Sequence, residues 1–112
     1  MKLITAVIKP FKLEEVREAL TSIGVQSLMV SEVKRYVRQC GHNEMYRGAE
    51  YVVNYVPKIR LEIAAAAADV DKIVDTIATT ARTGKIGDGK IFVWGIQNAM
   101  RVSTGEVGEE AL

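Results

Sequence analysis

The sequence predicts a single α+β domain in which two β-α-β units follow one another and share one antiparallel sheet. Two observations support this prediction. Short apolar runs typical of strands alternate with two stretches of helical spacing, and a long irregular segment separates two similar halves. The length of 112 residues and the apolar content of 48% suit one modest hydrophobic core.

The first half is predicted to contain a strand, a helix and a second strand. Residues Leu3–Lys9 are mostly aliphatic or β-branched and precede Pro10, as expected for a buried strand. A helix should follow and end at Gly24, because apolar residues recur there at helical spacing between charged ones. These apolar residues are Leu13, Val16, Ala19, Leu20 and Ile23. The second strand is expected at about Ser27–Val37.

The middle of the chain has a different character. The segment Arg38–Asn54 has glycines, charges and aromatic rings but no helical period, so we expect a long irregular loop over about 37–55. The strand after it should lie near Ile59–Ile63, where apolar and charged residues alternate. The run Ala64–Ala68 either extends this strand or enters the next helix.

The second half repeats the pattern of the first. Asp69 is expected to cap a helix with one apolar face. That face contains Val70, Ile73, Val74, Ile77 and Ala81. A glycine-rich loop over 83–90 then leads into a last core strand, Ile91–Trp94, and a C-terminal loop covers about 101–112.

The resulting order, β-α-β-β-α-β, is the ferredoxin-like arrangement. It places both helices on one face of a four-stranded antiparallel sheet, and the single domain spans 1–112. The other sheet face would be uncovered. Because the strands are so apolar, we expect that face to be buried by self-association, which predicts a homo-oligomer. The alternative is a monomer with one polar sheet face.

Composition excludes several classes of protein. Fifteen Lys+Arg against fourteen Asp+Glu give a net charge of +1, without the strong positive charge typical of a nucleic-acid-binding domain. The single cysteine, Cys40, excludes an intramolecular disulfide and a Cys₄ zinc site. No apolar run is long enough to span a bilayer, and the start of the chain does not match a signal peptide. We therefore expect a cytoplasmic protein that does not insert into membranes.

The strongest local motif is the segment Gly84–Lys90, which matches G-x-x-x-x-G-K. Residue 91 is Ile rather than Ser or Thr, and the loop leaves a helix and enters a strand, which is the reverse of a P-loop. Its glycines can still adopt positive φ, so successive N–H groups could converge on an anion. Lys85, Lys90 and Arg101 could add positive charge. The alternative is a tight turn with solvated lysines.

Two features of the long loop remain open to interpretation. The segment Tyr46–Tyr51 has the composition of a recognition surface, or is simply a solvated loop. Cys40, His42 and Glu44 alternate and could bind a metal, or the thiol is incidental.

A phosphoanhydride hydrolase using the glycine-rich loop is a further hypothesis, but no general base and no hydroxyl for Mg²⁺ is evident.

Two long motifs together resemble the PII signal-transduction proteins, the nitrogen regulators of bacteria, archaea and plastids. They are Tyr46-Arg47-Gly48-Ala49-Glu50-Tyr51 and Thr83-Gly84-Lys85-Ile86-Gly87-Asp88-Gly89-Lys90-Ile91-Phe92-Val93. The segments Ile8–Leu13, Val16–Leu20 and Thr104–Glu106 also resemble the family, and the similarity covers essentially the whole chain.

The resemblance implies a regulatory homotrimer rather than an enzyme, with ATP or ADP bound in clefts between subunits. The nucleotide contacts that it implies are Arg38, Gly87, Asp88, Gly89, Lys90 and, from the neighbouring subunit, Arg101. It also implies that Mg-ATP can recruit 2-oxoglutarate, with Gln39, Lys58 and Ile86 at that ligand. In the long loop, which is implied to contact a membrane transporter or a metabolic enzyme, Arg47 resembles the residue that plugs an ammonium channel. Tyr51 is the implied site of uridylylation.

Several positions depart from the usual pattern of the family. Arg35-Tyr36-Val37 replaces Gly-Phe-Gly, Ser27 and Met29 replace a glycine and a threonine, Cys40 replaces a lysine, and Ser103 replaces an arginine. A β-branched residue at 37 restricts φ and adds bulk, and the loss of an arginine at 103 removes one charge-assisted contact. The departures leave open whether ATP, ADP or AMP is preferred, and whether 2-oxoglutarate binds. They also leave open a divergent paralogue that regulates a transporter other than the ammonium channel.

Overall fold

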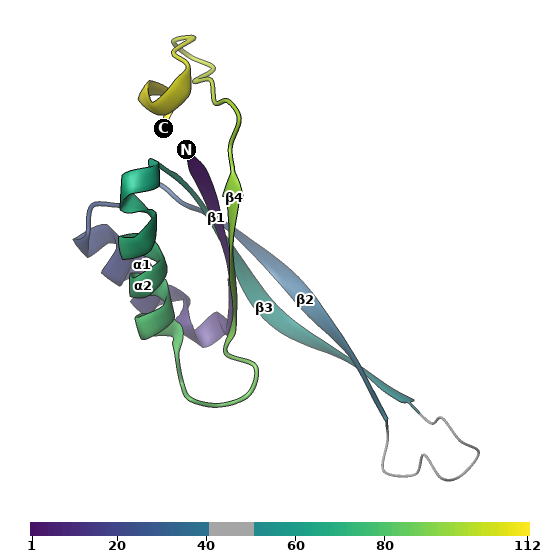
Figure 1. The fold of residues 1–112 in the computed structure, drawn as a ribbon. Coiled ribbons are helices and arrows are strands. Elements are labelled where there is room, and N and C mark those ends of the chain that lie inside the picture. Colours follow the sequence, from purple (N-terminus) through teal and green to yellow (C-terminus); the bar gives the residue numbers. More distant parts are fainter. Residues whose placement is uncertain (41–50) are drawn as a thin grey trace.

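The structure of the protein is a computed structural model that describes residues 1–40 and 51–112 (Figure 1). The predicted order of strands and helices is confirmed. The elements are β1 (Lys2–Ile8), α1 (Leu13–Ser22), β2 (Met29–Cys40), β3 (Tyr51–Ala65), α2 (Val70–Ala81) and β4 (Gly89–Gly95). Short 3₁₀ turns cover Pro10–Lys12, Ala67–Asp69 and Gly108–Ala111.

The four strands form one antiparallel sheet in the order β2-β3-β1-β4, with both helices against the same face (Figure 1). The core lies between the helices and this face. In β1 every second residue points into it, since Ile4, Ala6 and Ile8 are all buried. The other fully or nearly buried apolar residues are Val16, Leu20, Ile59, Leu61, Ile63, Ala65, Ile73, Ile77 and Ala81.

The opposite face of the sheet, which we call the open face, is not covered by either helix (Figure 1). Strand pairing places Thr5, Glu62 and Phe92 in one row of this face, and Leu3 and Trp94 in the next. Phe92 and Trp94 expose 47% and 57% of their surface, so the open face carries large apolar side chains in contact with solvent. The predicted uncovered face is thus present, and it carries apolar side chains of β4 beside polar side chains of β3 such as Glu62.

The middle of the chain differs from the prediction of a loop over about 37–55. Strand β2 continues to Cys40 and β3 begins at Tyr51, and the two remain paired up to those residues. The twelve residue pairs from Met29↔Glu62 to Cys40↔Tyr51 form a ladder that projects well beyond the helices (Figure 1). The physical reason is that β2 and β3 satisfy each other's backbone groups, which local sequence periodicity does not reveal.

Two helix termini test the predicted caps. Gly24 follows α1 with a φ of 99°, which confirms it as the residue that ends the helix. The expected cap by Asp69 is wrong, because Asp69 has helical backbone angles and its side chain accepts no capping hydrogen bond. A 3₁₀ turn over Ala67–Asp69 leads into α2 instead, while Ala64 and Ala65 extend β3.

The C-terminal loop is folded rather than extended. Arg101 donates its backbone N–H to the carbonyl of Glu106 at 2.8 Å, and Met100 pairs with Val107. The chain then ends with the turn Gly108–Ala111, and Glu109 of this turn borders the same hollow as Ala65, which pairs with Lys2 of β1. Among residues 1–40 and 51–112, no helix is both long and apolar enough to cross a lipid bilayer.

Candidate functional site

The glycine-rich loop connects the end of α2 to the start of β4, and its last glycine lies against β1. Gly84, Gly87 and Gly89 have φ values of 82°, 91° and 123°. The prediction that Gly87 and Gly89 adopt positive φ is therefore confirmed. Gly89 pairs with Ile8, and a Cβ added to it would lie 1.8 Å from the carbonyl oxygen of Val7. Only glycine fits this junction, because any side chain would overlap the backbone of β1.

The carboxylate of Asp88 holds the two ends of this loop together. It accepts hydrogen bonds from the hydroxyl of Thr83 and from the backbone N–H groups of Thr83 and Gly84, the latter two at 2.8 and 3.0 Å. The ammonium of Lys9 lies 3.2 Å from the same carboxylate. The hydroxyl hydrogen bond from Thr83 contributes most to lowering the pKa of Asp88 well below its ordinary value.

This pKa predicts how the loop responds to acid. Since the folded-state pKa of Asp88 is depressed, its contribution to stability is complete above the unfolded value near 3.8 and is lost as pH falls further. We expect Asp88→Asn to lower the unfolding free energy at pH 7. The difference between wild type and variant should shrink when urea unfolding is repeated between about pH 4 and pH 2. A difference that stays constant over that range would contradict the role given to Asp88.

Lys58 is a buried charged residue beside the glycine-rich loop. Its side chain is on the open face of the sheet, yet only 4% of its surface is exposed. Its ammonium donates a hydrogen bond to the carbonyl of Gly87, so β3 contacts the loop directly. Burial lowers the pKa of Lys58, and the neighbouring charges of Arg35 and Lys9 lower it further. Asp88 opposes that shift. An anion beside Lys58 would therefore be stabilised by a cation that is incompletely neutralised.

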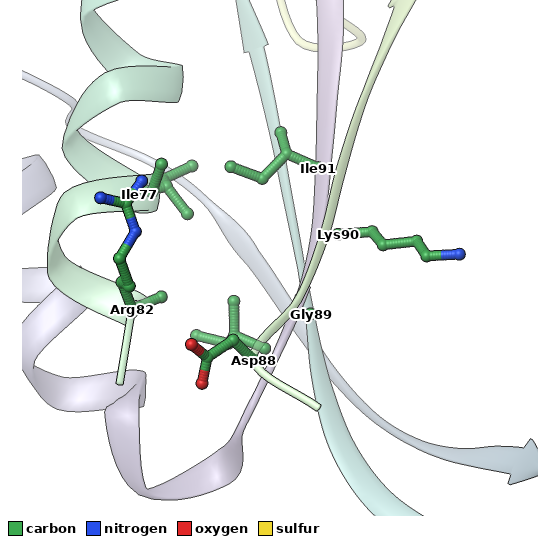
Figure 2. A pocket seen from close by; sticks show the side chains of 9 residues that line it. Ile77, Arg82, Asp88, Gly89, Lys90 and Ile91 are labelled. Carbon is green, nitrogen blue, oxygen red and sulfur yellow. The ribbon is translucent and has the colours of Figure 1, made fainter. Parts of the chain in front are cut away.

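Two hollows border the loop. One, of about 360 Å³, opens on the open face of the sheet. It is lined by Val7, Arg35, Lys58, Ile86, Gly87, Asp88, Gly89, Lys90 and Phe92, and we call it the open-face cavity. The other, of about 270 Å³, lies between α2 and β4 and is bordered by Ile77, Arg82 and Ile91 (Figure 2). The side chain of Lys90 points away from this second hollow (Figure 2).

The open-face cavity brings together several residues that the sequence suggested separately. Gly87, Asp88, Gly89 and Lys90 line it together with Lys58, which lies far from them in the sequence. Ile86 also lies at its wall and is 99% exposed. The cations Lys58 and Lys90 and the apolar ring of Phe92 give the cavity the mixed character that an anionic ligand with an organic part would require.

The predicted residues in and beside the long loop fall into two groups. Arg38 and Gln39 belong to β2, opposite Val53 and Val52, and Tyr51 is the first residue of β3. The structure describes the backbone of these residues and of Cys40, but not their side chains. Arg47, His42 and Glu44 lie outside the described residues altogether. Within the part of the chain that the structure describes, no group of three His, Cys, Asp or Glu residues could hold a metal ion.

Arg101 does not reach the glycine-rich loop of its own chain. The loop lies at the end of the sheet where Ile8 pairs with Gly89, whereas Arg101 follows the end where Lys2 pairs with Gly95 (Figure 1). There its guanidinium lies 3.5 Å from the Glu106 carboxylate. It also donates to the carbonyls of Glu110 and Leu112 at 3.3 Å. Within one chain, Arg101 therefore stabilises the C-terminal turn.

Sequence reasoning missed two parts of this site. The ion pair between Lys9 and Asp88 had no local signal, because 79 positions in sequence separate residues that only the sheet brings together. Arg35 was noticed only as an unusual residue, yet it lines the same cavity as Lys58. The alternation of β2 and β3, combined with their pairing, could have placed both side chains on one face.

Fold and site define a small ferredoxin-like domain whose helix-to-strand loop borders a cationic cavity. The family model for nitrogen regulatory protein P-II matches residues 1–106. The chain is 60% identical to nitrogen regulatory protein P-II of Rhizobium etli and 57% identical to GlnK of Escherichia coli K12, each over the full length of both chains. A solved structure of B. subtilis GlnK has a TM-score of 0.88 and 37% identity, and covers 99% of this chain and 97% of that one.

A second solved structure is described as a B. subtilis GlnK–ATP complex. It has a TM-score of 0.90 and 37% identity, and covers 99% of this chain and 96% of that one. The chain belongs to the P-II family of nitrogen regulatory proteins. It is a regulatory signal transducer and not an enzyme, which leaves the hydrolase hypothesis without support.

Proposed function

We propose that this P-II protein senses adenine nucleotides, with ATP or ADP bound at the open-face cavity and AMP as a further candidate. The observation that carries the proposal is the cavity itself, where a glycine-rich loop with positive φ values lies beside Lys58 and Lys90. Backbone N–H groups and cations in one place are the elements of a phosphate site. The likeness to a GlnK–ATP complex supports the same ligand class. The residues of one chain that would contact the nucleotide are Arg38, Gly87, Asp88, Gly89 and Lys90.

The proposal includes two further ligands. Mg²⁺ and 2-oxoglutarate would bind next to the phosphates, near Gln39, Lys58 and Ile86. The buried ammonium of Lys58 supports this, because a carboxylate would relieve the electrostatic strain that Arg35 and Lys9 impose on it. Since Asp88 is already held by Thr83 and Lys9, its role toward the nucleotide is to shape the loop more than to bind a metal.

The site is completed by assembly into a homotrimer. Arg101 lies at the opposite end of the sheet from the glycine-rich loop, so it can contribute to the same ligand only from a neighbouring copy. The exposed Phe92 and Trp94 on the open face are the kind of apolar surface that association buries. Sedimentation of the native protein measures this directly, and a single-chain species at working concentration would contradict it.

The output would pass through the β2–β3 ladder and the segment beyond it. Nucleotide binding through Lys58, in the middle of β3, is connected to Tyr51 by continuous pairing between β2 and β3. We propose that this segment contacts a membrane transporter or a metabolic enzyme in the cytoplasm, and that Tyr51 is a uridylylation site. A ligand can drive such a change only if it binds the two output states with different affinity.

Calorimetric titration with ATP, ADP and AMP, with and without Mg²⁺ and 2-oxoglutarate, tests the ligand assignment. Saturable heats should be accompanied by higher thermal stability, because a ligand at one hundred times its Kd stabilises the folded state by about 2.7 kcal/mol. Lys90→Gln should lower the affinity for ATP and ADP, since it removes one positive charge from the cavity. No heat and no stabilisation with any of the three nucleotides would refute nucleotide sensing.

A further inference from the structure

Arg35 belongs to the wall of the open-face cavity. It lies in β2 opposite Val56, two residues beyond Val33, which pairs with Lys58. Because side chains alternate along a strand, Val33 and Arg35 share the face on which Lys58 lies. Arg35 and Lys58 border the same hollow of about 360 Å³, together with the backbone of Gly87 and Gly89. The guanidinium thus has access to any ligand that the loop holds.

The charges around Arg35 favour an anion at this place. In the described part of the chain, no carboxylate forms an ion pair with Arg35, Lys58 or Lys90. The one carboxylate at the cavity, Asp88, is already bonded to Lys9 and to the backbone of the loop. Three cations therefore border the hollow without a described ion-pair partner. The lowered pKa of Lys58 has the charge of Arg35 among its causes, as expected for cations that share a small volume.

We propose, on the basis of the nucleotide-sensing function above, that Arg35 is a further anion-binding residue of this cavity and favours the more highly phosphorylated nucleotide. A planar guanidinium can donate two parallel hydrogen bonds to one phosphate, which the ammonium groups of Lys58 and Lys90 cannot do. A third cation also benefits a triphosphate more than a monophosphate, because the Coulomb attraction grows with the number of anionic charges nearby. The ratio of ATP affinity to AMP affinity should therefore depend on Arg35.

The test compares Arg35→Gln with Lys34→Gln by calorimetric titration of the native oligomer with ATP and with AMP. Lys34 is the matched control, since it loses the same charge from the adjacent position of β2 but lies on the opposite face of the strand. Arg35→Gln should weaken ATP about tenfold and AMP less than threefold, so that the ATP:AMP affinity ratio falls. The same ratio should be unchanged in Lys34→Gln. It should be only partly retained in Arg35→Lys, which keeps the positive charge but loses the paired guanidinium hydrogen bonds.

Salt provides a second readout. Raising the ionic strength should weaken ATP binding to wild type more steeply than to Arg35→Gln, because the variant makes one fewer ionic contact. An Arg35→Gln protein with the wild-type ATP:AMP ratio and the wild-type salt dependence overturns the assignment of Arg35 and leaves nucleotide sensing intact. A wild-type protein that binds neither nucleotide overturns both proposals.

Discussion

Replacing Gly89 with alanine should destabilise the protein by about 3 kcal/mol and abolish anion binding at the open-face cavity. The new Cβ would lie 1.8 Å from the carbonyl oxygen of Val7 and 2.9 Å from its carbonyl carbon. Both atoms belong to the backbone of a central strand, so neither can move without disturbing β1. The φ of 123° adds further strain, since a residue with a side chain rarely adopts it. Urea unfolding at a fixed protein concentration measures the loss.

Two other glycines separate the causes of this effect. Gly84 also has positive φ, at 82°, but an added Cβ would meet no atom within 4 Å, so Gly84→Ala should cost only about 1 kcal/mol. Gly95 has neither problem, and Gly95→Ala should change stability by less than about 0.5 kcal/mol. If Gly89→Ala proved as stable as Gly95→Ala, the described junction between the loop and β1 would be incorrect.

The contrast between these glycines shows what the sequence could and could not predict. The motif alone indicated positive φ at Gly87 and Gly89, because glycines so closely spaced in a turn are typical of such backbone. It could not indicate that Gly89 touches Val7, since that contact depends on β1 and β4 being neighbours in the sheet. The fold order followed from periodicity, whereas the close approach that makes one glycine indispensable is a property of tertiary packing.

Lys58 illustrates a second limit of sequence reasoning. The alternation of Lys58, Arg60 and Glu62 with apolar residues correctly predicted one polar and one buried face of β3. That pattern gives no reason to treat the three polar residues differently. In the structure Arg60 is exposed, whereas Lys58 is only 4% exposed and contacts the glycine-rich loop through the carbonyl of Gly87. Likewise, the failed cap at Asp69 reflects a 3₁₀ turn that sequence spacing did not predict.

The same burial leads to a prediction in which stability and binding change in opposite directions. Lys58→Met keeps the length and apolar stem of the side chain but removes its charge. The variant should be at least as stable as wild type at pH 7, because the lost ammonium is buried and close to two other cations. Anion affinity at the cavity should nevertheless fall about 30-fold, equivalent to about 2 kcal/mol, since a buried charge contact to the ligand is lost. Lys72→Met, which changes an exposed lysine of α2, serves as the control.

The pH dependence makes this prediction specific to Lys58. A lysine whose folded-state pKa is lowered binds fewer protons in the folded state than in the unfolded state just below pH 10.5. The difference in unfolding free energy between wild type and Lys58→Met should therefore shift in favour of wild type as pH rises toward 10.5. If the difference in unfolding free energy instead shifts in favour of Lys58→Met over that range, the folded protein stabilises the ammonium of Lys58. The cavity would then lack the uncompensated positive charge on which its affinity for an anion depends.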